Sequence, residues 1–289
     1  MKIAEAIVAP SYAGHLDVQG IFDAALQHEA DGDLDAAVRG YVEVVRGAHE
    51  QTEPYQRLLR IHLHRREIDA AWCAASMIAA VGTLEDAQAE LYEDYRPRRL
   101  PPIGRGMSVQ EWQLLRAPCD EAVSAVLAQQ IVRLAPRSPT SIPALDPEVV
   151  EWAVTAFSLA PQGKAIAEGT SLDEAASYFT LRERRFAAGR EAARLRVPHL
   201  VLAESSVASL EEALREATVA GDVRAWQAAL LSTEMRAGLL VCGEPRVARD
   251  LLVAQSTSED LLADIAAFSV SPVHHHLRAQ LGLAVDMAE

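Results

Sequence analysis

Lysine, cysteine and aromatic residues are scarce in this sequence. Lys2 and Lys164 are the only lysines, and we attribute the use of arginine elsewhere first to a GC-rich bacterial genome. Cys73, Cys119 and Cys242 lie far apart and form no Cys-x-x-Cys pair, so neither a disulfide framework nor a zinc ribbon is supported. The apolar residues are mainly alanine, leucine and valine, which favour closely packed helices over a β-sandwich.

Signals for secretion, for membrane insertion and for common catalytic sites are also missing. The N-terminal run "MKIAEAIVAPSYAG" has one lysine and is interrupted by Pro10, unlike a secretory signal. No apolar stretch reaches the ~18 residues of a membrane span. The sequence contains no Gly-x-Ser-x-Gly elbow, no phosphate-binding P-loop and no Gly-x-Gly-x-x-Gly motif. We therefore expect a cytoplasmic protein without a standard catalytic motif.

The net charge limits the classes of partner. Acidic residues number 41 and basic residues 27, which gives a formal charge of −14. A protein that binds nucleic acid or an anionic membrane surface normally carries a positive footprint. The expected partner is therefore another protein, and the oligomeric state stays open.

Two similar hexamers recur after 34 residues, "GDLDAA" from Gly32 and "REIDAA" from Arg66. Small and apolar residues follow in both copies at the spacing of a packed helix: Ala37, Tyr41 and Val44, then Ala71, Ala75 and Ile78. This pattern resembles the tetratricopeptide repeat, a helix–turn–helix unit of 34 residues, over residues 20–95. The family's usual proline is absent, since His49 and Thr83 stand near its places. Alanine-rich helices without a true repeat remain the alternative.

The resemblance implies a short platform of stacked helices that binds a segment of another protein. A third helix within "TLEDAQAELYEDY" would cap the platform. The candidate contact residues lie on the first helix of the second copy: Gln56, Arg57, Arg60 and His64. A convex surface could equally bear them.

Turn and cap signals divide the chain and predict an all-α fold. The expected parts are an N-terminal segment 1–19, helical repeats 20–95, a Pro/Arg linker 96–107, a helix and Pro-rich linker 108–147, and a helical C-terminal domain 148–289. Helix starts are expected at a set of Ser/Glu capping boxes and at residues followed by proline: Ser108/Glu111, Asp146–Pro147, Ser171/Glu174, Ser209/Glu212, Ser256/Glu259 and Ser271–Pro272. Only 199–205, "HLVLAES", competes as a strand.

Two stretches of the second half, 186–200 and 232–252, resemble the gluzincin metallopeptidases. In that family a glutamate helix supplies the third zinc ligand and continues through small residues to a turn and Pro-x-x-Ala. The matching positions here are Glu234, Ala237, Gly238, Gly243, Pro245 and Ala248. The family's zinc-binding helix carries His-Glu-x-x-His, with two imidazoles one helical turn apart and the glutamate as base.

This chain departs from that motif at both imidazole positions. Arg190 and Arg194 stand where the histidines would be, and Glu191 holds the position of the base. A guanidinium stays protonated and offers no lone pair to a metal. The resemblance thus implies a degenerate, inactive zincin-like domain without metal or cofactor, as in large modular bacterial repeat proteins. If it is real, 186–194 and 232–243 pack side by side and bring Glu234 to Arg190, Glu191 and Arg194.

The remaining motifs have plainer explanations. The arginines of 180–196 are expected on a solvated or ion-paired face, with an acidic protein segment or a phosphate ligand as alternatives. His274–His276 are expected as a surface run, because successive helical side chains are ~100° apart and three in a row do not close on one ion. One of them could still join Glu234 or His199. His62 is expected to be packed, His64 exposed, and Cys73 structural.

The function expected from these observations is a non-catalytic interaction or scaffold protein that uses helical-repeat surfaces. Two alternatives stay open. One is a metal-dependent hydrolase of gluzincin type, and the other is a regulator whose arginine helix binds an anionic ligand.

Overall fold

The computed structural model describes residues 6–7, 17–96, 105–118, 120, 147–158, 180–216 and 220–285. Within these ranges the chain is helical, which confirms the all-α fold class. The exception is a parallel bridge between two strands of two residues each, β1 (Ala6–Ile7) and β2 (Ala220–Gly221).

The first helices form two helical hairpins with the spacing seen in the sequence. Helix α1 (Val18–Ala30) and helix α3 (Thr52–Arg65) start 34 residues apart, as do α2 (Leu34–Gly47) and α4 (Ile68–Val81). Asp17 and Asp33 cap α1 and α2 with their side chains. Gly32, with a φ of 80°, turns the chain between these two helices, because glycine adopts a positive φ without strain.

Residues at the repeat positions form the interior of this unit. All six side chains singled out by their spacing are buried: Ala37, Tyr41, Val44, Ala71, Ala75 and Ile78. A Cβ atom added to Gly40 would lie 2.7 Å from the Cβ of Ala25, so α1 and α2 approach closely through small residues. Helix α5 (Asp86–Asp94) follows α4 and begins at Glu85, two residues later than the expected start at Thr83.

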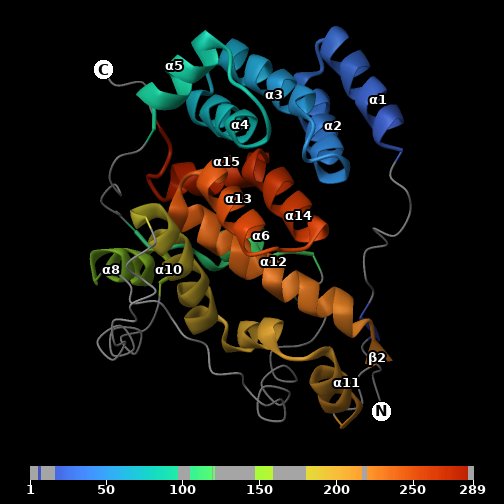
Figure 1. The fold of residues 1–289 in the computed structure, drawn as a ribbon, viewed down its shortest axis with the longest axis vertical. Helices are drawn as coiled ribbons and strands as arrows, with labels where there is room; N and C mark the ends of the chain where they lie inside the picture. Colours follow the sequence, from blue (N-terminus) through green and yellow to red (C-terminus); the bar gives the residue numbers. More distant parts are fainter. Residues whose placement is uncertain are drawn as a thin grey trace.

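The remaining elements make up the second half. In chain order they are α6 (Val109–Leu115), α8 (Pro147–Ala156), α10 (Leu181–Arg196), the 3₁₀ helix η3 (Pro198–Glu204), α11 (Val207–Glu216), α12 (Val223–Cys242), α13 (Pro245–Ala254), α14 (Glu259–Ser269) and α15 (Pro272–Gln280). Helix α12 crosses this half diagonally and packs against α10 on one side and α13, α14 and α15 on the other (Figure 1).

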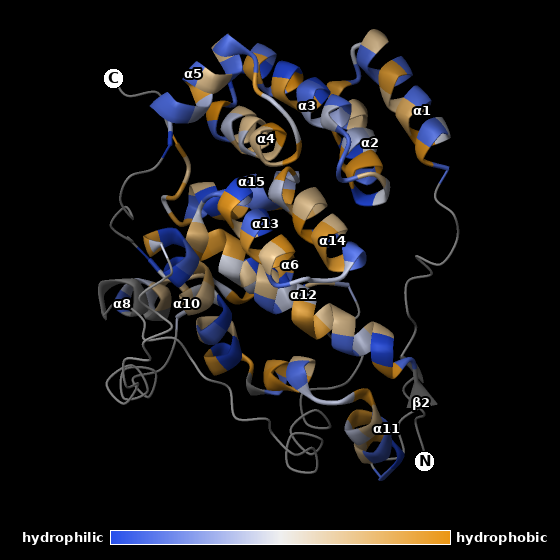
Figure 2. Cartoon of the chain, viewed as in Figure 1, coloured by the Kyte–Doolittle hydropathy of each residue, from blue (hydrophilic) through white to orange (hydrophobic). Residues whose placement is uncertain are grey.

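The two halves are joined through the second helix of each hairpin. Helix α2 packs against α14, and α4 packs against α13, α14 and α15. Ala266, Ala267 and Val270 of the second half belong to the same apolar cluster as the hairpins. Helices α1 and α3 lie on the outer side of the hairpins (Figure 1). Hydrophilic residues are frequent along α3, whereas α4 is mostly apolar (Figure 2).

Several local expectations are corrected. Residues 199–205 fall in the 3₁₀ helix η3 and form no strand. Helix α11 is capped by Ser206, whose Oγ accepts from the Ser209 N–H, rather than by Ser209. Helix α14 begins after Ser258 and not at Ser256, which has a φ of 53°. A nearby serine competed for the cap in both cases.

Other local expectations are confirmed or untested. The Ser108/Glu111 capping box and the Ser271–Pro272 start are present. Helix α8 starts at Pro147. Cys119 and the Ser171/Glu174 pair lie outside the described residues. In the described part of the chain no single helix has the length and apolar character of a membrane span; α4 and α5 together do, but with a bend of 117°.

Candidate functional site

Helices α10 and α12 cross at close range because glycines stand at the crossing. A Cβ atom added to Gly189 would lie 2.4 Å from the carbonyl oxygen of Ala237. One added to Gly238 would lie 2.9 Å from the carbonyl oxygen of Phe186. Real Cβ atoms do not approach backbone so closely, so larger residues would force the helices apart. The two stretches compared with the gluzincins therefore lie side by side.

The crossing brings together the four residues of the degenerate frame. The Arg194 guanidinium binds Glu234 in a bidentate manner, with Nε 2.8 Å from Oε1 and Nη2 2.8 Å from Oε2. Its Nη1 donates to Oε1 of Glu191 at 2.8 Å. The Nη2 of Arg190 lies 3.3 Å from Oε2 of Glu234. We call Arg190, Glu191, Arg194, Glu204 and Glu234 the ionic cluster.

Glu204 is the member of this cluster that the sequence did not indicate. It ends η3, and its carboxylate binds Arg194 and lies 3.4 Å from Arg190. The segment 199–205 was a candidate strand, and nothing in its pattern pointed to the arginines of the preceding helix. An excess of carboxylate over guanidinium in the cluster, three against two, leaves one formal negative charge.

Burial decides the electrostatics of the cluster. Burial raises the pKa of Glu234, whose side chain is fully buried, and the hydrogen bonds from Arg194 oppose this rise. Burial likewise raises the pKa of Glu191, against the charges of Arg194 and Arg190. Burial opposes the charge of Arg194, but its hydrogen bonds to Glu234 outweigh this and raise the pKa of the guanidinium. The arrangement holds two helices and η3 together by charge-assisted hydrogen bonds.

The arginines of α10 do not form a solvated face. Arg185 and Arg194 are buried, and Arg182, Arg184, Arg190 and Arg196 are half-buried. Arg196 donates to the carbonyl oxygen of Phe157 at 2.6 Å. The ion-paired half of the expectation holds, and the solvated half is wrong, because α10 lies between α8 and α12.

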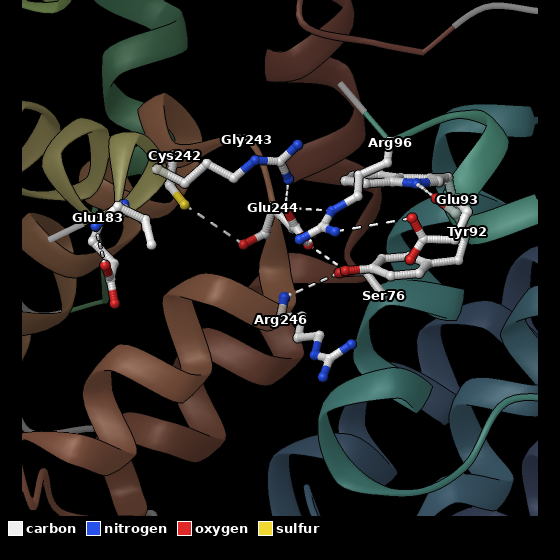
Figure 3. Close-up of polar contacts among 12 residues, drawn as sticks. Ser76, Tyr92, Glu93, Arg96, Glu183, Cys242, Gly243, Glu244 and Arg246 are labelled. Carbon is white, nitrogen blue, oxygen red and sulfur yellow. Dashed lines mark hydrogen bonds and ion pairs between the residues drawn. The ribbon is translucent and has the colours of Figure 1, made fainter. Parts of the chain in front are cut away.

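A second buried carboxylate, Glu244, joins the hairpins to this region (Figure 3). The Tyr92 hydroxyl donates to Oε1 of Glu244, and the Arg96 Nε lies 3.2 Å from the same oxygen. Arg182 of α10 also forms an ion pair with this carboxylate. Glu244 lies between the matching positions Gly243 and Pro245 but was not singled out. It links α5, α10 and the start of α13.

The four candidate contact residues on α3 differ in exposure. Arg57 is half-buried and lies 3.7 Å from Glu29 and 3.4 Å from Glu53, so α1 and its own helix already bind it. Gln56 is also half-buried, whereas Arg60 and His64 are exposed.

Leu63, which the sequence analysis did not select, is 44 % exposed between Arg60 and His64. Arg60 and His64 make no hydrogen bond or ion pair within the described part of the chain. These three residues form what we call the α3 surface.

The histidines correct the expectation of a surface run. His274 is fully buried, His275 is half-buried, and only His276 of the three is exposed. Neither Glu234 nor His199 joins them; the neighbouring side chain is Cys73 of α4. His62 is buried and His64 exposed, as predicted. The burial of His274 depends on the docking of α15 against α4, which no local pattern reveals.

Comparison of the chain with models of protein families, with curated proteins and with solved structures found no match.

Proposed function

We propose that this chain is a non-catalytic interaction protein that binds a partner protein through the α3 surface. The observation that supports this function is the use of the two sides of the hairpins. Helices α2 and α4 are covered by α13, α14 and α15, whereas Arg60, Leu63 and His64 on α3 remain exposed. In stacked helical pairs one row of helices forms the core and the other is available for recognition.

The chemistry of the α3 surface favours an acidic segment as its partner. Arg60 is an exposed cation in a chain whose formal charge is −14. Leu63 adds an apolar contact beside it, and exposed arginine next to an apolar side chain is typical of binding hot spots. An acidic partner segment would find here a local positive site on an otherwise acidic protein, which aids orientation and selectivity.

We further propose that α10 and α12 derive from a gluzincin-like metal site. Arg190, Glu191 and Arg194 stand in the His-Glu-x-x-His frame, and Glu234 reaches the same point from the second helix. Small residues at the crossing, Gly189 and Gly238, support the same comparison. In this proposal guanidinium groups replaced the ligands, and the site became a structural clamp.

The alternative functions find less support in these contacts. A gluzincin hydrolase needs lone pairs at positions 190 and 194, and guanidinium groups have none to give. An anionic ligand on α10 would have to displace the carboxylates of Glu191, Glu204 and Glu234 from Arg194. A buried, bidentate carboxylate is a strong competitor for a phosphate.

The test is affinity capture with charge reversal. The full chain, immobilised through a terminal tag without histidine, is incubated with lysate of its native host, beside Arg60→Glu and Arg224→Glu. Arg224 is exposed at the start of α12, far from α3, and is the matched control. We expect one protein to be retained by the wild type and by Arg224→Glu, and about tenfold less by Arg60→Glu. Equal retention by all three baits, or peptide cleavage by the purified chain, would contradict the proposal.

A further inference from the structure

Three chemically suited side chains meet where α15 docks against the hairpins. Cys73 on α4 and His274 and His275 on α15 each place one ligand atom within 4.8 Å of the others. A fourth, His62 of α3, contacts His275 edge-on, with ring centroids 5.4 Å apart. The group therefore draws on three helices of both halves of the chain.

The nitrogen atoms of these imidazoles have an unusual hydrogen-bond pattern. The Nδ1 of His274 lies 2.8 Å from the Ser269 carbonyl oxygen, and the Nδ1 of His62 lies 2.6 Å from Oε2 of Glu67. An Nδ1–H that donates to each acceptor leaves the lone pair on Nε2. The Nε2 atoms of His62, His274 and His275 are all buried and have no hydrogen-bond partner.

Such a pattern is typical of metal-binding histidines. Their second ring nitrogen normally donates to a backbone carbonyl or a carboxylate, which fixes the tautomer and turns the other nitrogen to the metal. A buried polar atom without a partner otherwise costs about 1–3 kcal/mol. Three of them around one buried thiol are hard to explain by packing alone, since apolar residues would fill the same space at lower cost.

The protonation states suit binding of a cation. Burial lowers the pKa of His274 to about 3, so its imidazole is neutral at neutral pH. Burial also lowers the pKa of His275 and of His62. Burial raises the pKa of the Cys73 thiol, so metal binding would release its proton to solvent as the sulfur–metal bond forms. The nearby Arg278 is neutralised by Asp69, 2.8 Å away.

We propose that Cys73, His274 and His275 bind a borderline transition-metal ion, with zinc as the expected ion and His62 as the fourth ligand. One thiolate and three imidazoles match the preference of zinc for sulfur and nitrogen ligands in a tetrahedral site. Bonds of about 2.0–2.3 Å place tetrahedral ligand atoms roughly 3.3–3.8 Å apart, so the side chains must close by about 1 Å on binding.

Four protein ligands leave no open coordination position, which characterises a structural site. The ion would tie α3 and α4 to α15 and so fix the hairpins to the second half of the chain. This inference is independent of the proposed function, because the α3 surface lies outside the group.

The experiment measures metal binding by the full chain made without a histidine tag. After purification and dialysis the zinc content is determined, and chelator-treated protein is then titrated with Co²⁺. We expect about one equivalent of zinc per chain, and with cobalt the thiolate charge-transfer band and intense visible bands of a tetrahedral site. The variants Cys73→Ala and His274→Ala should lose binding by 10- to 100-fold.

Two neighbouring variants are the controls. Cys242→Ala removes the other buried free cysteine of the described residues, and His276→Ala removes the adjacent exposed imidazole. Both should keep the metal. Should Cys73→Ala fold poorly, alkylation of Cys73 in the unaltered chain gives a second measurement, because bound zinc must slow it relative to chelator-treated protein. A wild-type chain that takes up neither zinc nor cobalt, or a Cys73→Ala chain that keeps the charge-transfer band, would overturn the proposal.

Discussion

Arg194 on α10 and Glu234 on α12 form a bidentate, buried ion pair at the crossing of the two helices, with both nitrogen–oxygen distances at 2.8 Å. Glu234 is fully buried, so its charge has no access to water. Arg194 also binds Glu191 and Glu204. One guanidinium therefore compensates much of the negative charge that three segments bring to this point.

Removal of Arg194 should be strongly destabilising. Arg194→Leu leaves Glu234 buried with Arg190 as the nearest cation, and loss of one partner of a buried pair costs about 3–5 kcal/mol. Urea unfolding measures the change, with the exposed Arg215→Ala as control at within about 0.5 kcal/mol. Adding Glu234→Gln to Arg194→Leu should recover part of the loss. A double variant as unstable as the sum of the two single variants would show that the pair is not coupled.

The two repeat copies provide a matched comparison at equivalent aspartates. Asp69 accepts from Nε and Nη2 of the fully buried Arg278, whereas Asp35 pairs with Arg65 at a side-chain exposure of 73 %. Asp69→Asn should lower the free energy of unfolding by about 3 kcal/mol or more. Asp35→Asn should change it by less than about 1 kcal/mol. Equal effects would mean that Asp69 does not fix α15 to the hairpins.

Glu111 should make stability depend on acidity. Hydrogen bonds from Arg105, together with those from Ser108, lower the pKa of Glu111 from about 4.5 to about 2. Because the folded-state pKa is the lower one, the stabilisation is present in full above the unfolded value and is lost as the pH falls toward 2.

Urea midpoints of wild type and Glu111→Gln should therefore differ at pH 7 and converge between pH 4.5 and pH 2, the range set by these two values. The exposed Glu212→Gln serves as the control, with an effect within about 0.5 kcal/mol. A constant difference between wild type and Glu111→Gln over this range would exclude Glu111 as the source.

Short-range patterns predicted well where the structure depends on neighbours in sequence. The 34-residue spacing gave the starts of four helices, since Ala71 and Ala75 follow one face of α4. The face of Arg190 and Arg194 also followed from their separation of one helical turn.

Features that depend on docking of distant segments were not predictable. Glu204 reaches Arg194 from a 3₁₀ helix, a conformation without a clear sequence signal. His274 is buried only because α15 packs on α4. The cysteine that faces it, Cys73, lies 201 positions earlier in the chain, and no local pattern connects the two.

The central claim is that guanidinium groups occupy the ligand positions of a metal site on α10 and α12, so that the chain acts by binding and not by turnover. The most direct measurement is the zinc affinity of the Arg190→His/Arg194→His variant, made in a Cys73→Ala background to remove the other proposed site. Two imidazoles and Glu234 would complete a three-ligand zinc site.

The account predicts about one equivalent of zinc in this variant. It also predicts that adding Glu234→Gln weakens zinc binding by at least tenfold, and that the Cys73→Ala background alone takes up none. A double-histidine variant that folds and binds no zinc, or a background that binds zinc through Arg190 and Arg194 as they stand, would contradict it.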